Sequence, residues 1–210
     1  MTLDEIERAL KPHHLTVFGG VKTGLPEGLK TLLLLGPKTP GFWPHFTTSP
    51  ESRDRSADPL DRWSSRVITQ LAQTLGARAF FPFGGPPWQP FLQWAVDSGR
   101  AHISPVGLLV HDDAGLMVSY RGALGFTQDI KLPKPPPNPC QTCADRPCLS
   151  ACPVDALTPK GYDVAACKTD LDRAGNDCLT RGCAVRRACP VSQAHGRSED
   201  QSAFHMRAFK

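Results

Sequence analysis

All eight cysteines of this 210-residue chain lie between Cys140 and Cys189, and the 139 residues before them contain none. Thiol chemistry is therefore confined to one segment. A segment this small buries little apolar surface, so its folding is expected to depend on what the thiols hold. The remaining length suffices for one ordinary domain with a core of its own. We therefore expect two domains.

The cysteines form two similar groups. The spacing reads Cys140-x2-Cys143-x4-Cys148-x3-Cys152-Pro153, then Cys167, then Cys178-x4-Cys183-x5-Cys189-Pro190. Three close cysteines suit three corners of one [4Fe–4S] cubane, because a short loop exposes backbone N–H groups to the sulfurs. In two-cluster ferredoxins, the cysteine before proline ligates the other cluster. The pattern predicts two [4Fe–4S] clusters with all eight cysteines as iron ligands.

A family resemblance covers about residues 138–210. The run CQTCADRPCLSACPVDAL, with YDVAACKTDL, DCLTRGCAVRRACPV and AFHMRAF, resembles bacterial 4Fe–4S ferredoxin-type proteins and, more distantly, the cluster domain of epoxyqueuosine reductase. The resemblance implies a ferredoxin-like domain. By the reductase pattern, the first cluster is held by Cys140, Cys143, Cys148 and Cys189. The second is held by Cys152, Cys167, Cys178 and Cys183.

Other uses of the cysteines stay open. Zn²⁺ also accepts four thiolates and C-x2-C spacing, so two structural zinc sites are an alternative. One cluster with four spare cysteines is another. A disulfide scaffold is less favoured, because clustered cysteines in a reducing compartment more often bind metal. Cysteine triplets ending in Cys-Pro favour cubanes over the paired knuckles of zinc sites.

Charged and titratable residues lie among the second group of cysteines. Arg181, Arg186 and Arg187 would favour a reduced, more negative cluster and raise its potential, or else form a solvated helix face. His195 and His205 are candidate ligands or proton carriers. Eight cysteines already complete two cubanes, so structural roles are favoured for both histidines.

Helix signals recur along the chain. Thr2 with Glu5 is a capping-box pattern that predicts a first helix ending near Pro12. Ser198 with Gln201 predicts a last helix that packs Phe204 and Phe209 inward. The clearest helix starts after Asp58 and ends at Gly76, and another runs over residues 90–98. The apolar stripe of the clearest helix, which is predicted to be core, is Leu60, Trp63, Val67, Leu71 and Leu75.

Strand signals accompany these helices. LTVFGGV and RAFFPF are predicted strands, and Thr31–Gly36 reads as a buried central strand. Residues 37–57 are predicted to be a long loop with an aromatic patch. The two β-rich runs on either side of residues 111–115 predict a hairpin. The fold class is therefore α+β, with an N-terminal α/β domain before the ferredoxin-like one.

Residues 131–139, KLPKPPPNP, suit neither a helix nor a central strand. Their composition predicts a stiff polyproline spacer of roughly 28 Å, at ~3.1 Å per residue. The predicted organisation is a domain over 1–130, a linker over 131–139 and the cluster domain over 140–210.

A second resemblance concerns the N-terminal domain. The stretch ISPVGLLVHDDAGLMVSYRGAL resembles epoxyqueuosine reductase, reductive dehalogenases and cobalamin-trafficking decyanases. It implies a nitroreductase-like α/β domain and a corrinoid as a further cofactor, with flavin as the alternative. The chain has no D-x-H-x-x-G, G-x-G-x-x-G or Walker loop. Where the reductases place an acidic residue, it has Gly84-Gly85-Pro86-Pro87.

Two groups of residues in this domain are candidate sites. Aromatic rings near the glycine pair could stack on a flat cofactor, although a turn into a core helix is favoured. Polar residues at the predicted hairpin tip are candidate catalytic groups, although such tips are polar anyway. The rings are Phe83, Trp88, Phe91 and Trp94, and the tip residues are His111, Asp112 and Asp113.

The formal charge of +4 counts every cysteine as neutral. An oxidised [4Fe–4S] core with four thiolates adds 2−, so two sites bring the total to about zero and nucleic acid is not an expected partner. The acidic start MTLDEIERAL does not resemble an export signal, and the longest aliphatic run, Leu32–Leu35, is too short to cross a bilayer. We expect a cytoplasmic location.

Three functions stay open on this basis. The favoured one is electron transfer through two clusters to a redox partner protein or to a site on the N-terminal domain. The second is a corrinoid- or flavin-dependent reductase with built-in clusters. The third is an iron–sulfur protein whose clusters are structural or regulatory. The sequence decides neither whether the chain is an enzyme nor its oligomeric state.

Overall fold

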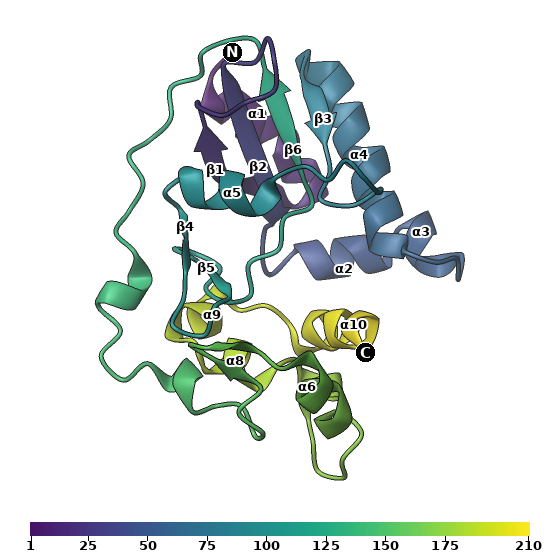
Figure 1. Cartoon of the computed structure of the whole chain (residues 1–210). Coiled ribbons are helices and arrows are strands. Elements are labelled where there is room, and N and C mark those ends of the chain that lie inside the picture. Colours follow the sequence, from purple (N-terminus) through teal and green to yellow (C-terminus); the bar gives the residue numbers. More distant parts are fainter. The chain divides into compact units, whose positions relative to one another are not determined.

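The computed structural model describes all 210 residues, and the chain forms two compact units (Figure 1). The first comprises Met1–Arg100 and Ser119–Pro136, and the second comprises Ala101–Val118 and Pro137–Lys210. Both combine helices with small antiparallel sheets, which confirms a mixed helix–sheet fold. The units do not follow the linear division at residues 130 and 140, because residues 101–118 belong with the cysteine segment.

The first unit is built on a four-stranded antiparallel sheet with strand order β1-β2-β6-β3. The strands are β1 (Leu15–Val21), β2 (Thr31–Pro37), β3 (Arg78–Phe80) and β6 (Gly122–Phe126). All seven residues of β2 are buried, as predicted for a central strand. Helices cover both faces of the sheet, which is why β2 has no alternation of polar and apolar residues.

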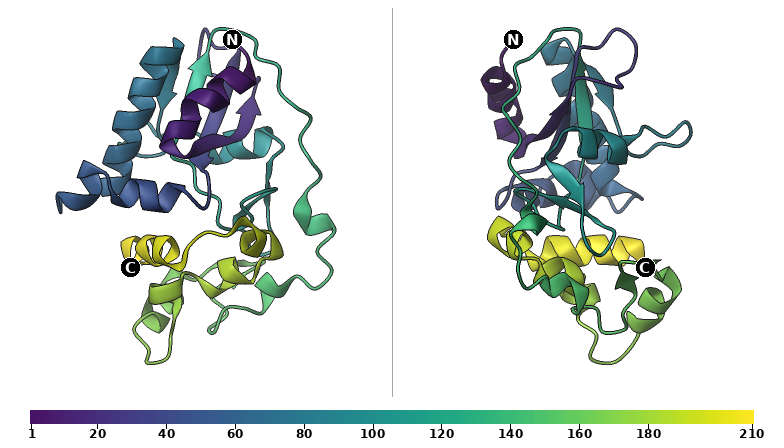
Figure 2. Two further views of the ribbon diagram at one scale, coloured as in Figure 1. Left: turned by 180° about the vertical axis from the view of Figure 1, so that it is seen from behind. Right: turned by 60° about the vertical axis from the view of Figure 1, so that its left-hand side comes forward.

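The helices of this unit are α1 (Leu3–Leu10), η1 (Lys11–His13), α2 (Phe42–Thr47), α3 (Pro50–Arg53), α4 (Pro59–Leu75) and α5 (Phe91–Asp97). α1 and α4 lie on one face of the sheet and α5 lies on the other (Figures 1 and 2). The Thr2 and Glu5 capping box is present, with both reciprocal hydrogen bonds. α4 begins at Pro59 and ends at Gly76, as its sequence predicts.

The segment 37–57 is not the long loop that its composition predicts, because it contains α2 and α3. Phe42 and Phe46 lie one turn apart on α2, and both are buried. Each ring packs edge-to-face on Trp63 of α4, with centroid distances of 5.4 and 6.2 Å. Tertiary packing of these rings stabilises a short helix that local propensity does not favour.

The proline-rich linker forms no helix or strand over residues 131–138. Residues up to Pro136 count with the first unit. The Leu132 side chain lies over Gly20 of β1, and Pro135 lies over Gly99. The linker is therefore partly packed against the first unit rather than being a free spacer along its whole length.

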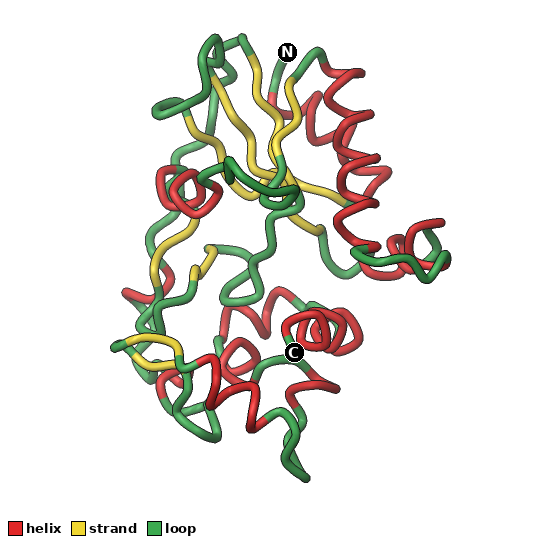
Figure 3. The backbone as a smooth tube through the Cα atoms, turned by 45° about the vertical axis from the view of Figure 1, so that its right-hand side comes forward, coloured by secondary structure: helices red, strands yellow, loops and turns green.

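The second unit consists of short elements connected by loops (Figure 3). Its strands form two small antiparallel pairs, β4 (Ala101–Ile103) with β5 (Leu109–His111), and β7 (Leu157–Thr158) with β8 (Gly161–Tyr162). Its helices are η2 (Pro139–Gln141), η3 (Pro147–Leu149), α6 (Val164–Asp170), α7 (Cys178–Arg181), α8 (Ala184–Ala188), α9 (Pro190–His195) and α10 (Glu199–Phe209). The Ser198 hydroxyl caps α10 by accepting from the Gln201 N–H, as predicted.

The predicted hairpin around residues 111–115 is wrong in its strand pairing. The paired strands are β4 and β5, joined through Ser104–Leu108, while β6 pairs with β2 and β3 in the other unit. His111 and Gly115 do form a tight turn with reciprocal backbone hydrogen bonds. The run after it does not continue as a strand, because its first residue, Leu116, is drawn into the core of the cysteine unit.

That core explains why residues 101–118 belong to the second unit. Val106, Val110 and Leu116 are each about 1% exposed and pack with Leu157 and Val185 from the cysteine segment. Buried Cys148 and Cys189 complete the same cluster. The cysteine segment alone has few large apolar residues, so the hairpin supplies much of the apolar surface that the unit buries. No helix in either unit is long and apolar enough to cross a membrane.

We predict that Leu116→Ala destabilises the second unit by about 2–5 kcal/mol, because it deletes a buried leucine and leaves a cavity. Ile103→Ala is the matched control in the same segment, residues 101–118. Its side chain is 61% exposed, and its loss should change stability by less than about 0.5 kcal/mol. Amide hydrogen exchange over residues 137–210 measures both effects.

The first unit provides the internal reference for this experiment. All four tryptophans lie in it, at positions 43, 63, 88 and 94, so tryptophan fluorescence follows its unfolding alone. If Leu116→Ala weakened the tryptophan-reported transition and left exchange in residues 137–210 unchanged, the assignment of the hairpin to the second unit would be wrong.

Candidate functional site

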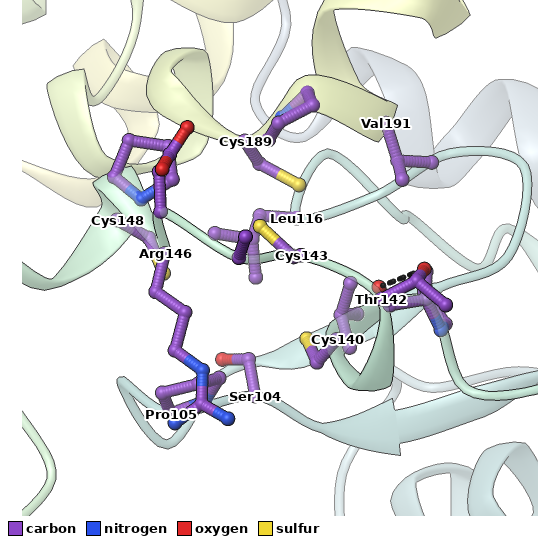
Figure 4. A pocket seen from close by; sticks show the side chains of 16 residues that line it. Ser104, Pro105, Leu116, Cys140, Thr142, Cys143, Arg146, Cys148, Cys189 and Val191 are labelled. Carbon is purple, nitrogen blue, oxygen red and sulfur yellow. Dashed lines mark hydrogen bonds between the residues drawn. The ribbon is translucent and has the colours of Figure 1, made fainter.

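Four cysteines surround a cavity of about 510 Å³ in the second unit (Figure 4). They are Cys140, Cys143, Cys148 and Cys189, which we call the first set. Three come from the loop that carries η2 and η3, and Cys189 comes from the junction of α8 and α9. The Asn138 side chain accepts from the Cys140 N–H at 2.9 Å and fixes the start of this loop.

The other four cysteines surround a second, smaller cavity of about 20 Å³. They are Cys152, Cys167, Cys178 and Cys183, which we call the second set. Cys167 lies on α6, Cys178 begins α7, and Cys183 follows that helix. Gly182 holds a φ of +91° and lies against Ser202 of α10, where a Cβ atom would come within 2.5 Å. Glycine there lets the chain carrying Cys183 pack closely on α10.

The two cysteines that precede proline are exchanged between the sets. Cys152 follows the first three cysteines in sequence but lines the second cavity. Cys189 follows Cys178 and Cys183 but lines the first cavity. The chain therefore crosses between the two cavities twice, and the grouping equals the ligand partition that the reductase resemblance implies.

All eight cysteines are free thiols. Burial raises the pKa of the Cys140 thiol, and repulsion from its neighbours Cys148, Cys189 and Cys143 adds to the shift. Burial also raises the pKa values of the Cys148, Cys167 and Cys178 thiols. Thiolates crowded in either cavity repel one another, so both sets suit a positively charged group that offsets this repulsion.

The thiols line cavities rather than converge on a point. No three cysteine, histidine or acidic side chains are arranged to hold a single metal ion. A cubane places one iron at each of four separate corners, so its four cysteine sulfurs stand around a volume. In residue type and number both sets fit such a group, and the first set also surrounds a cavity that is large enough for it.

Hydrogen-bond donors approach the sulfurs of the second set. The Ala156 N–H donates to the Cys152 sulfur at 3.2 Å, and the Ala184 N–H donates to the Cys178 sulfur. The Tyr162 hydroxyl donates to the Cys167 sulfur, and burial together with this bond raises the pKa of the tyrosine. The Tyr162 ring stacks on Phe209 of α10 at a centroid distance of 6.0 Å, which holds the hydroxyl in place.

The three arginines near the second set differ in their partners. Arg181 is exposed and pairs with Glu199 at 2.7 Å and Asp177 at 3.2 Å, as expected for a solvated helix face. Arg187 also bonds to Asp177, so its charge is shared.

Arg186 is partly buried and donates to the Leu116 carbonyl of the 101–118 segment. Burial lowers the pKa of its guanidinium, while the Cys183 thiol and the Tyr162 hydroxyl act in the opposite direction. Arg186 and Arg187 are therefore both placed to compensate negative charge in the second set, Arg186 beside Cys183 and Arg187 beside Cys178.

The candidate histidines and aspartates line neither cavity. His111 is fully buried, and its Nδ1 accepts from the N–H groups of Asp113 and Ala114 at 3.1 and 3.2 Å. It therefore shapes the turn instead of standing at an exposed tip. Burial lowers the pKa of His195, whose Nδ1 lies 3.8 Å from the Asp113 carboxylate. The His205 ring packs edge-on against Phe204.

The aromatic residues near Gly84 and Gly85 do not form one surface. Phe91 and Trp94 are buried and pack on each other at 5.2 Å, as expected for a core helix. Trp88 is 64% exposed, and Phe83 packs on Phe81 at 5.3 Å. The four rings are divided between core and surface, so they give no support for a stacked flat cofactor.

Residues 101–118 contribute to the site, and no sequence pattern predicts this contribution. The residues of this segment that line the first cavity are Ser104, Pro105, Val110 and Leu116. Nothing in their type or spacing signals proximity to cysteines that begin more than twenty positions later. A buried run such as VGLLV indicates only that it packs somewhere.

Comparison with known proteins does not identify a function, so the functional assignment depends on the residues of the site. No protein-family model matches the chain, and a search of curated proteins finds no match. What the second unit offers chemically is two sets of four thiols, each around its own cavity, with donors and a guanidinium beside the second set.

We predict that oxidation of the protein under non-denaturing conditions joins Cys189 to a member of the first set and Cys152 to a member of the second. In denaturant, pairing should instead follow sequence proximity, because short loops cost less entropy to close. Cys152 would then pair mainly with Cys148, and Cys189 with Cys183, their nearest cysteines in the sequence. Peptide mapping by mass spectrometry measures both. The grouping is contradicted if protein oxidised under non-denaturing conditions gives the same pairs as denatured protein.

Proposed function

We propose that the chain is an iron–sulfur electron-transfer protein that binds two [4Fe–4S] clusters. The observation that carries this proposal is the division of eight thiols into two sets of four, each around one cavity. Four thiolates are the full ligand complement of one [4Fe–4S] cluster. The first set would hold one cluster and the second set the other.

The exchange of Cys152 and Cys189 supports a ferredoxin-like arrangement. In that arrangement each cysteine before proline serves the cluster that its own triplet does not hold. Loss of one cluster then strains the loops of the other. The clusters would thereby tie together a unit made of short helices and loops, and metal binding would supply much of its folding free energy.

Electron transfer is favoured over substrate chemistry at the clusters because the ligand set is complete. When every iron corner carries a cysteine sulfur, no corner is open for a substrate, and such a cluster exchanges electrons without forming bonds. The electrons would pass to a redox partner protein or to a site on the first unit.

Charge and compartment agree with this function. Each site would add 2− to a chain of formal charge +4, so the loaded protein carries about zero net charge, which does not favour nucleic acid as a partner. Eight free thiols suit a reducing compartment, and we propose the cytoplasm.

The resemblance to epoxyqueuosine reductase keeps a reductase function as the alternative. It would place a corrinoid or a flavin on a nitroreductase-like first unit. The resembling stretch, residues 103–124, is divided between both units, and its first sixteen residues pack with the cysteine segment. This division weakens the case for a cofactor domain built around that stretch.

We predict about eight irons and eight sulfides per chain after anaerobic purification, with no zinc, because two sets of four thiolates suit two cubanes. Metal analysis and sulfide determination test this directly. Four irons per chain would overturn the two-cluster assignment, and stoichiometric zinc would replace it with structural zinc sites.

The absorption spectrum of the same preparation separates the alternatives. The electron-transfer proposal expects iron–sulfur absorption alone and clusters that accept electrons at physiological potentials. Bound flavin, or cobalt with a corrinoid spectrum, would favour the reductase. Clusters that resist reduction would favour a structural or regulatory role.

A further inference from the structure

The Ser104 hydroxyl lies in the wall of the first cavity, between β4 and β5 (Figure 4). The residue is 5% exposed, and its Oγ has no hydrogen-bond partner in the protein. Its backbone is fully used, since its N–H donates to the Leu108 carbonyl at 2.8 Å and its carbonyl accepts from Gly107 at 2.9 Å. The hydroxyl is therefore held in a fixed place with an unmet bond.

Buried hydroxyls are almost always hydrogen-bonded, because an unmet donor costs free energy. The neighbouring lining residues Pro105, Val110 and Leu116 have apolar side chains that cannot accept this bond. The Thr142 hydroxyl, across the cavity, donates to the Pro139 carbonyl at 3.4 Å. The side-chain acceptors that remain in the cavity lining are the four cysteine sulfurs and the Asp145 carboxylate, and the sulfurs are the ones that a cluster would bring together.

We propose that Ser104 donates a hydrogen bond to a sulfur of the first cluster and thereby raises the reduction potential of that cluster. The inference rests on the proposed function, because it requires a cluster on Cys140, Cys143, Cys148 and Cys189. A donor stabilises sulfur more when the cluster gains an electron and becomes more negative. Ser104 acts through the cluster, so it is a positioning residue.

The origin of this donor gives residues 101–118 a role in the chemistry. The sulfurs of the second set receive their donors from within the cysteine segment, at Ala156, Tyr162 and Ala184. Ser104 lies 36 positions before Cys140. The β4–β5 hairpin therefore completes the first site, and its position sets the potential of the first cluster separately from that of the second.

The test is a redox titration of the full-length, cluster-loaded protein followed by EPR. Cys143→Ser and Cys183→Ser variants assign the signals of the two reduced clusters. Ser104→Ala is expected to shift the first cluster to a lower potential and leave the second unchanged. Ser104→Thr keeps a hydroxyl and should stay near the wild-type value.

Ser192→Ala is the matched control. Ser192 is 2% exposed and its Oγ also has no partner, yet it lines neither cavity. Its substitution should move neither potential. Tyr162→Phe gives the reciprocal result, because it removes a donor to Cys167 and should lower the potential of the second cluster only.

Unchanged potential of the first cluster in a Ser104→Ala protein that retains both clusters would overturn the inference and leave the two-cluster function intact. Equal shifts in Ser104→Ala and Ser192→Ala would overturn it too. If Ser104→Ala fails to assemble the first cluster, Ser104→Gly keeps both backbone bonds and serves in its place. Absence of clusters from the wild-type protein would instead contradict the proposed function.

Discussion

Repulsion between thiolates is the constraint on which the cysteine unit depends. Four thiols share each cavity, and burial with mutual repulsion raises the pKa of the Cys140 and Cys148 thiols. Such an arrangement is stable as four thiolates only around a compensating positive charge. The proposed iron–sulfur core would supply that charge and join loops that are distant in sequence. Cys140, Cys148, Cys167 and Cys178 each lie on one of the short helices η2, η3, α6 and α7.

The unit that holds the thiols is discontinuous. Residues 101–118 leave the first unit, contribute Val106, Val110 and Leu116 to the core around Cys148 and Cys189, and return to form β6. The same segment supplies Ser104 to the first cavity and the Leu116 carbonyl to Arg186 beside the second set. Residues 101–118 thus stabilise the cysteine unit and contact residues of both sets, so part of the first 130 residues helps to form the candidate site.

Sequence patterns predict what is local or periodic. α4 begins and ends at its predicted signals, both capping residues act as expected, and β2 is central because its run is apolar throughout. Sequence patterns fail to predict the structure where a contact with a residue distant in the sequence determines it. α2 forms because Phe42 and Phe46 find Trp63, and Arg186 differs from Arg181 only in what surrounds it. Nothing in the sequence distinguishes Ser104 from other serines in turns, and its candidate role is indicated only by its position in the wall of the first cavity. The division of the eight cysteines into two sets is implied by the family resemblance, since their spacing alone leaves that division open.

EPR of a Cys189→Ala protein distinguishes crossed ligation by Cys189 from ligation in sequence order. Signals of the two reduced clusters are first assigned with Cys143→Ser and Cys183→Ser. Crossed ligation predicts that Cys189→Ala damages first the cluster that Cys143→Ser affects. The other cluster should show a smaller loss, because cluster binding stabilises the whole unit. If Cys189→Ala instead reproduces the Cys183→Ser spectrum and spares the first cluster, ligation follows the sequence and the crossed arrangement is wrong.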